Sequence, residues 1–223
     1  MRVQPADLSA MYKRSRSRLS EIAGSLADAK AVSVPACPGW SVHDVVSHLV
    51  AVAEDVLAGK LTGSPTDEAT ARQVRRRAVW STLDVLDDWG RVGAQVEEML
   101  LEVPAWPVAV DALTHEHDVR GAAGLPGHRT DGDVVSVAAV LLGRLEVPAH
   151  LTVLCEDQRF RCGDDEHAGA AALELVTDPF EAFRFRMGRR SRRQLAGMQW
   201  NGDPEPVLDH LTVFGPSRVD IIE

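Results

Sequence analysis

Cysteine is scarce in this chain of 223 residues. The three cysteines, Cys37, Cys155 and Cys162, form no Cys-x-x-Cys pair. A small odd number in this arrangement argues against a disulfide framework and against a thiolate zinc site. We therefore expect histidine and carboxylate side chains to hold any bound metal.

Long apolar runs are also missing. The most apolar stretch, residues 134–142, is far shorter than the roughly 20 residues that span a bilayer, and the first residues lack the apolar segment of a signal peptide. We expect a cytoplasmic protein with no membrane partner. Basic charge is in deficit as well, with a net charge of −9, and this excludes wholesale nucleic-acid binding, which requires a basic surface.

The composition is that of an ordinary globular protein, with 45% hydrophobic and 26% charged residues. Apolar residues at helical spacing predict long helices joined by short loops, which is typical of a helical bundle. Ser41 and Asp44 form a capping-box pattern at the start of the second helix. The predicted helices cover residues 5–30, 41–57, 67–101, 107–123 and 131–145.

The character of the sequence changes near residue 147. Three short β-like runs, at 149–155, 158–162 and 171–177, are followed by two short helical segments at 178–187 and 189–197. We therefore predict a mainly α protein, with a helical bundle over residues 1–146 and a small α+β domain over 147–223.

The most informative chemical feature is a pair of residues four positions apart, Asp111 and His115. In a helix this spacing brings their side chains together on one face, and here that face is otherwise apolar. A buried carboxylate and imidazole need a partner, because unpaired burial is costly. A metal ion and a direct Asp–His hydrogen bond are both compatible with the pattern.

A third metal ligand should come from a neighbouring helix. The second predicted helix offers His43 and His48, which flank its apolar stripe on opposite sides. His43 lies in the first turn and His48 lies deeper in the helix. Periodicity alone does not choose between them.

Several segments together resemble the mycothiol-dependent maleylpyruvate isomerase family. PACPGWSVHDVVSHLVAVAEDVLAG resembles the family's Pro-Gly-Trp turn and the helix with its His-Leu pair, and TARQVRRRAVWSTLDVLDDW resembles its third helix. DALTHEHDVRGAAGLPGHR resembles its acid-x-x-x-His-x-x-Asp segment. TDPFEAFRFRMGRRSRRQLAGMQWNGDP resembles its Gly-Arg-Arg-Ser stretch and closing Trp-x-Gly-Asp.

The resemblance implies a DinB-like helical bundle followed by a small α+β domain similar to sterol carrier proteins. It also implies a divalent metal, usually zinc, held by two histidines and one carboxylate. On this chain those ligands are His48, Asp111 and His115, with Asp111 in a place where the family usually has glutamate. Asp118 matches the family's Asp after the histidine, and we interpret it as orienting a ligand histidine or capping the helix.

The implied function is a mycothiol-using isomerase or thiol S-transferase that acts on a small electrophile. Three protein ligands leave one metal position open, and a thiol bound there loses its proton. In the isomerisation, the thiolate adds to a conjugated cis double bond, the adduct rotates and the thiolate leaves. From an arginine-rich run we keep Arg189 and Arg190 as candidates for binding substrate carboxylates.

Two other functions remain open. Two histidines and one carboxylate also form the ligand triad of non-haem iron oxygenases. Alternatively, the protein is a non-enzymatic, metal-stabilised DinB-like module that binds a small ligand or a partner protein. The sequence gives neither the substrate nor the oligomeric state.

Overall fold

The computed structural model describes residues 5–60, 66–163 and 173–223. The chain divides after Gly127 into two compact units. We call the part before this point the helical unit and the part from His128 to Ile222 the mixed unit. The predicted boundary near residue 147 is 19 residues further along the chain.

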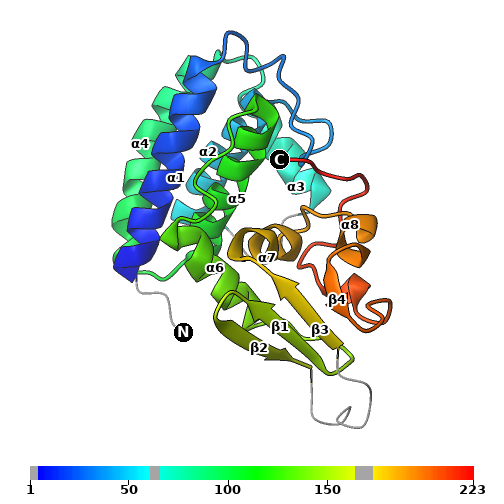
Figure 1. Ribbon diagram of the computed structural model, residues 1–223. Helices are drawn as coiled ribbons and strands as arrows, with labels where there is room; N and C mark the ends of the chain where they lie inside the picture. The colour runs from blue at the N-terminus through cyan, green and yellow to red at the C-terminus, as the bar shows by residue number, and fades with distance from the viewer. Residues whose placement is uncertain (1–4, 61–65, 164–172) are drawn as a thin grey trace. The chain divides into compact units, whose positions relative to one another are not determined.

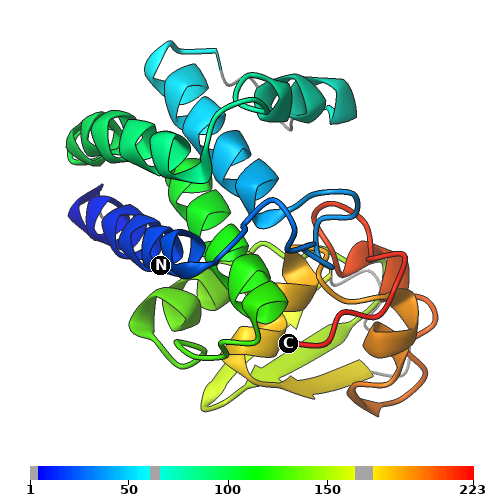
Figure 2. The same ribbon diagram turned by 90° about the horizontal axis from the view of Figure 1, so that it is seen from above.

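The helical unit contains five helices among its described residues (Figure 1). The helix α1 packs against α4 and α5, and α2 packs against α3, α4 and α5. The view from above shows α2 and α5 side by side (Figure 2). The helices are α1 (Pro5–Ser25), α2 (Val42–Leu57), α3 (Asp67–Arg75), α4 (Thr82–Leu100) and α5 (Trp106–Ala123).

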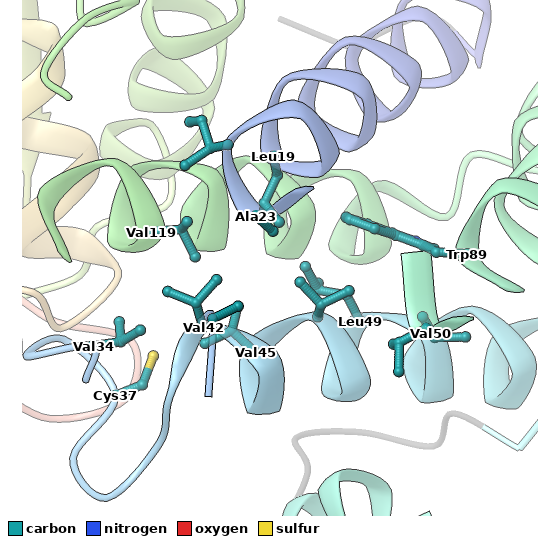
Figure 3. Close-up of a cluster of buried hydrophobic side chains, with 14 residues drawn as sticks. Leu19, Ala23, Val34, Cys37, Val42, Val45, Leu49, Val50, Trp89 and Val119 are labelled. Atoms are coloured by element: carbon teal, nitrogen blue, oxygen red, sulfur yellow. The ribbon is translucent and has the colours of Figure 1, made fainter. Parts of the chain in front are cut away.

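The core of this unit lies between α1, α2, α4 and α5. Valine and leucine side chains of α2 face Leu19 and Ala23 of α1 and Val119 of α5 (Figure 3). Trp89 of α4 is completely buried, and its indole Nε1–H donates to the hydroxyl of Tyr12 over 3.0 Å. This bond satisfies the one polar group of a large apolar side chain, so that Trp89 can fill the core.

The predicted start of the second helix is confirmed. Ser41 is the N-cap of α2, its side chain accepts from the backbone N–H of Asp44, and the Asp44 carboxylate accepts from the backbone N–H of Ser41. Such a capping box satisfies two backbone donors that the first turn leaves without helical partners.

The prediction of one long helix over residues 67–101 is wrong. The helix α3 ends at Arg75, and α4 begins at Thr82 with Ser81 as its N-cap. No glycine or proline marks the break. Instead, side chains from elsewhere satisfy the backbone carbonyls of the turn: Nε2 of His43 bonds to the carbonyl of Arg77, and Nζ of Lys30 donates to that of Ala78.

The first helix is also shorter than predicted. It ends at Ser25 rather than at residue 30. Beyond this point the backbone pairs with the start of α2, because the N–H of His43 donates to the carbonyl of Ala29 and that of Val42 donates to the carbonyl of Val32. These bonds replace the ones that a longer α1 would form.

The mixed unit combines short helices with a four-stranded sheet of order β2-β1-β3-β4. The strand β1 pairs antiparallel with β2 and parallel with β3, and β4 is antiparallel to β3. The helices α6 and α7 pack against each other. The elements are α6 (Gly132–Leu142), β1 (Leu151–Cys155), β2 (Gln158–Cys162), β3 (Leu173–Thr177), α7 (Pro179–Arg186), α8 (Arg192–Ala196), β4 (Gln199–Asn201) and the 3-10 helix η2 (Leu208–His210).

The described residues are thus mainly helical with one small sheet. Within residues 5–60, 66–163 and 173–223, none of the helices combines the length and the apolar character that crossing a lipid bilayer requires.

Candidate metal centre

Three of the predicted site residues converge where α2 and α5 pack together. Nε2 of His48 lies 3.6 Å from one carboxylate oxygen of Asp111, and Nε2 of His115 lies 3.6 Å from the other. One ligand atom from each residue can be chosen so that all three lie within 4.8 Å of one another. Asp111 and His115 face the same way because they are one helical turn apart in α5, and α2 supplies His48.

The His48 imidazole is oriented by a chain of polar side chains. Its Nδ1 lies 2.9 Å from Oε1 of Gln73, and the Gln73 amide nitrogen donates to Oδ2 of Asp55 over 2.9 Å. A carboxylate only accepts hydrogen bonds, so the Gln73 amide must point its nitrogen at Asp55 and its oxygen at His48. Nδ1 of His48 is therefore the donor, and in the neutral imidazole the lone pair is on Nε2, which faces Asp111.

The His115 imidazole is oriented in the same sense. Its Nδ1 donates to Oδ2 of Asp118 over 2.9 Å, and Asp118 is 1% exposed. In the neutral imidazole of His115 the lone pair is therefore on Nε2, which also faces Asp111. A carboxylate or amide that accepts the far N–H is the usual support of a metal-bound histidine.

This donor set fits a divalent cation. Two neutral imidazoles and a carboxylate can each donate an electron pair to a cation, and their Nε2 and oxygen atoms face one another. A cation satisfies all three, and histidine nitrogen with carboxylate oxygen is a common set for zinc. The side chains of His48 and His115 are 5% and 7% exposed and that of Asp111 is 30% exposed, although its Oδ2, which faces His48, is itself buried.

The indole of Trp40 covers the two histidines. Its ring centroid lies 5.1 Å from that of His48 and 6.4 Å from that of His115, and the His115 ring is nearly parallel to it. Trp40 comes from the Pro-Gly-Trp turn before α2. The turn therefore supplies an apolar wall as well as the entry to the helix.

The structure shows which of the two histidines of α2 lies at the candidate metal centre, a choice that periodicity did not make. His43 is buried, with Nδ1 3.0 Å from the hydroxyl of Thr82 and Nε2 3.2 Å from the carbonyl of Arg77. Burial lowers the pKa of His43 below its ordinary value. His43 thus supports the turn between α3 and α4, while His48 lies beside Asp111.

Arg189 and Arg190 lie in the mixed unit and have protein partners there. The Arg190 guanidinium is buried and binds the Glu181 carboxylate with two hydrogen bonds of 2.8 and 2.5 Å. Arg189 donates to the carbonyl of Met187 over 2.7 Å. Since the fork of Arg190 is occupied by Glu181, the contacts give it a structural role, and carboxylate binding by these two residues stays a prediction.

Other parts of the Gly-Arg-Arg-Ser stretch also have local structural roles. Gly188 has a φ of +74°, and a Cβ there would lie 2.6 Å from the carbonyl oxygen of Gly215. Glycine has no Cβ, so it adopts this positive φ without strain and avoids the clash with Gly215. Ser191 is the N-cap of α8 in a capping box with Gln194, and its hydroxyl lies 2.5 Å from Asp220.

Sequence reasoning missed Gln73 and Cys37 at this centre. Gln73 is 4% exposed, and it is the residue of α3 that the structure buries, although the helix also contains Ala69, Ala71 and Val74. Apolar periodicity therefore does not predict its burial. The Cys37 thiol donates to Oδ2 of Asp118 over 3.4 Å. The Cys-Pro-Gly-Trp order could have indicated Cys37, because it puts this residue in the same turn as Trp40.

Comparison with known proteins identifies the family of the chain. The family model for the mycothiol maleylpyruvate isomerase N-terminal domain matches residues 12–131. No curated protein shows significant sequence similarity to the chain.

Two solved structures share the fold. A crystal structure of a histidine-to-alanine mutant of mycothiol-dependent maleylpyruvate isomerase has a TM-score of 0.59 at 11% identity, covering 83% of this chain and 90% of that one. A crystal structure of mycothiol-dependent maleylpyruvate isomerase has a TM-score of 0.55 at 13% identity, with 84% and 90% covered. The matched residues 12–131 include α2 and α5 with His48, Asp111 and His115. The family model covers more than half of the chain, and the chain therefore belongs to the mycothiol maleylpyruvate isomerase N-terminal domain family.

Proposed function

We propose that this protein is a metal-dependent enzyme that uses mycothiol, or a similar small thiol, to isomerise or S-conjugate a small electrophile. The observation that carries the proposal is the convergence of two oriented Nε2 lone pairs on the Asp111 carboxylate. Membership of the family supports the choice of thiol.

The charge of the centre favours an anionic cosubstrate. Two neutral imidazoles and one carboxylate leave a bound divalent cation with one uncompensated positive charge. His48, Asp111 and His115 would hold the divalent metal, which would lower the pKa of a thiol bound beside them and so favour thiolate at neutral pH. The thiolate then balances the charge of the centre.

The chain's own residues provide orientation and access. Gln73 and Asp118 fix the two imidazoles, and Trp40 shields them from solvent on one side. Asp111 is the most exposed of the three ligand side chains, so a thiol and an electrophile would approach beside it. Reversible addition of the thiolate gives isomerisation, and displacement of a leaving group gives S-transfer.

A turnover assay tests the proposal. Zinc-loaded protein is incubated with mycothiol and a panel of small electrophiles, including maleylpyruvate and alkyl halides, and the loss of electrophile is followed by chromatography. We expect thiol-dependent turnover that falls at least a hundred-fold in His48→Ala. The matched control is His43→Gln, a change at the other buried histidine of α2, which should keep the activity. Absence of thiol-dependent turnover across the panel contradicts the proposal.

The same donor set supports two alternatives. Two histidines and one aspartate suit ferrous iron in oxygenases, and iron as the dominant metal of protein purified without added metal would favour that class. Bound zinc without turnover would favour a metal-stabilised binding module.

A further inference from the structure

A second group of metal-ligating side chains lies behind His115. Sγ of Cys37 is 3.6 Å from Nδ1 of His115 and 3.4 Å from Oδ2 of Asp118, and those two atoms are 2.9 Å apart. All three residues are buried, with Cys37 9%, His115 6% and Asp118 1% exposed. The three share one residue, His115, with the centre described above.

These separations resemble those between the ligands of one metal ion. With Zn–S near 2.3 Å and Zn–N near 2.0–2.1 Å, the ligand atoms of a tetrahedral site are about 3.3–3.6 Å apart. The two distances from sulfur fall within or next to this range, and the nitrogen–oxygen distance is a few tenths of an ångström shorter. A small outward movement of the Asp118 carboxylate would make room for an ion.

The charges also suit a divalent cation. A thiolate and a carboxylate together balance two positive charges, so this group needs no further anion, unlike His48, Asp111 and His115. Sulfur is a soft ligand and favours thiophilic metals. We propose that Cys37, His115 and Asp118 form a second metal site that is selective for thiophilic ions such as Cd²⁺. This second site competes for His115 with the first site, formed by His48, Asp111 and His115.

The competition follows from the imidazole itself. A neutral imidazole has one lone pair. An ion beside Cys37 takes that lone pair on Nδ1, so the ring proton moves to Nε2, and the Cys37 thiol releases its proton to solvent. The first site then keeps only His48 and Asp111 as ligands. We therefore expect thiophilic ions to inhibit catalysis. This expected inhibition rests on the proposed function, whereas the second metal site itself does not.

Cadmium titration of the metal-free full chain tests the site. Cd²⁺ alone is added without any small thiol, and the sulfur-to-cadmium charge-transfer band is recorded in the ultraviolet. We expect the band in the unmodified protein and in His48→Ala, which lacks a ligand of the first site only. It should disappear in Cys37→Ser and persist in the matched control Cys155→Ser. No band at saturating Cd²⁺ in the unmodified protein, or an equal band in Cys37→Ser, overturns the proposal.

Two further measurements keep the test independent of folding and of the proposed function. The ¹¹³Cd chemical shift of the unmodified protein reports sulfur ligation without any substitution, and a shift typical of nitrogen and oxygen ligands alone overturns the site. Zinc affinity and thiol-dependent turnover of Cys37→Ser report the first site. If the cadmium band depends on Cys37 but no turnover is found, the second site stands and the proposed function fails.

Discussion

Gln73 accepts a hydrogen bond from Nδ1 of His48 over 2.9 Å and is itself oriented by Asp55. The contact joins α3 to the centre of α2 and puts the imidazole lone pair on Nε2. Gln73 is therefore part of the candidate metal centre although it does not reach the ligand cluster.

Replacing Gln73 by leucine should weaken metal binding. The variant keeps the bulk of the side chain but removes the acceptor that orients His48, and loss of such a contact typically lowers metal affinity about 10- to 100-fold. A zinc competition titration with a chromophoric chelator measures the change. Gln199→Leu, at an exposed position in β4, is the control and should leave the affinity as it is. Equal affinities in both variants would show that Gln73 does not support the centre.

Metal content should depend on the two ligand histidines. We expect about one divalent ion per chain by elemental analysis, because His48, Asp111 and His115 form one three-ligand set and the group with Cys37 shares His115 with it. His48→Ala combined with His115→Ala should remove the ion, and His43→Gln should retain it. Loss of the metal in His43→Gln together with its retention in His48→Ala would show that the other histidine of α2 is the ligand.

The carboxylate should matter through its charge. Asp111→Asn keeps the shape of the side chain but removes the anion, and we expect metal affinity to fall on the order of ten-fold or more. Asp111→Glu should be tolerated, because the family usually has glutamate at this place. Isothermal titration calorimetry compares the metal affinities of the two variants. A glutamate variant that does not fold would show that packing between α2 and α5 is adapted to the shorter side chain.

Thiol activation should be visible without turnover. A free thiol has a pKa near 8.5, so only a few per cent is thiolate at pH 7. Cobalt-substituted protein should develop a sulfur-to-metal charge-transfer band on addition of mycothiol, and calorimetry in two buffers should detect proton release. The experiment is cleanest in Cys37→Ser, where the protein's own thiol next to the centre is absent. No new band and no released proton at saturating thiol would leave only the oxygenase or binding-module function.

Stability should fall in mild acid because of His43. Its pKa is lowered, first by burial and also by Lys30, against the opposing effects of the Arg77 carbonyl and Asp44. Below about pH 6.5 the unfolded chain binds a proton that the folded protein does not, so the free energy of unfolding decreases, with a limit of about 1.4 kcal/mol per pH unit for one group. Urea unfolding at pH 7.5 and 5.5 measures this loss. His43→Gln should reduce it, whereas His210→Gln, at an exposed position, should not.

Local sequence rules alone predicted some parts of this protein. The capping box of Ser41 and Asp44 and the end of α5 before Gly124 depend on backbone groups within a few residues. The pairing of Asp111 with His115 follows from the four-residue spacing in a helix. The predicted β-like runs correspond to β1, β2 and β3. The first two residues of the third predicted run, 171 and 172, and the polar segment 164–169 lie outside the described residues. Family membership could also be predicted, because its motifs are contiguous.

Other features depend on contacts between residues far apart in the sequence. Periodicity did not decide whether His43 or His48 lies near Asp111. The packing of α2 against α3, α4 and α5 puts His48 beside Asp111 and His43 against the turn between α3 and α4. The break between α3 and α4 depends on Lys30 and His43, more than 30 residues away. Cys37 meets Asp118 across 81 residues. The sequence by itself determined which residues could bind a metal, since this depends on side-chain chemistry and helical spacing; tertiary structure decided which of them meet, because that depends on how the helices pack.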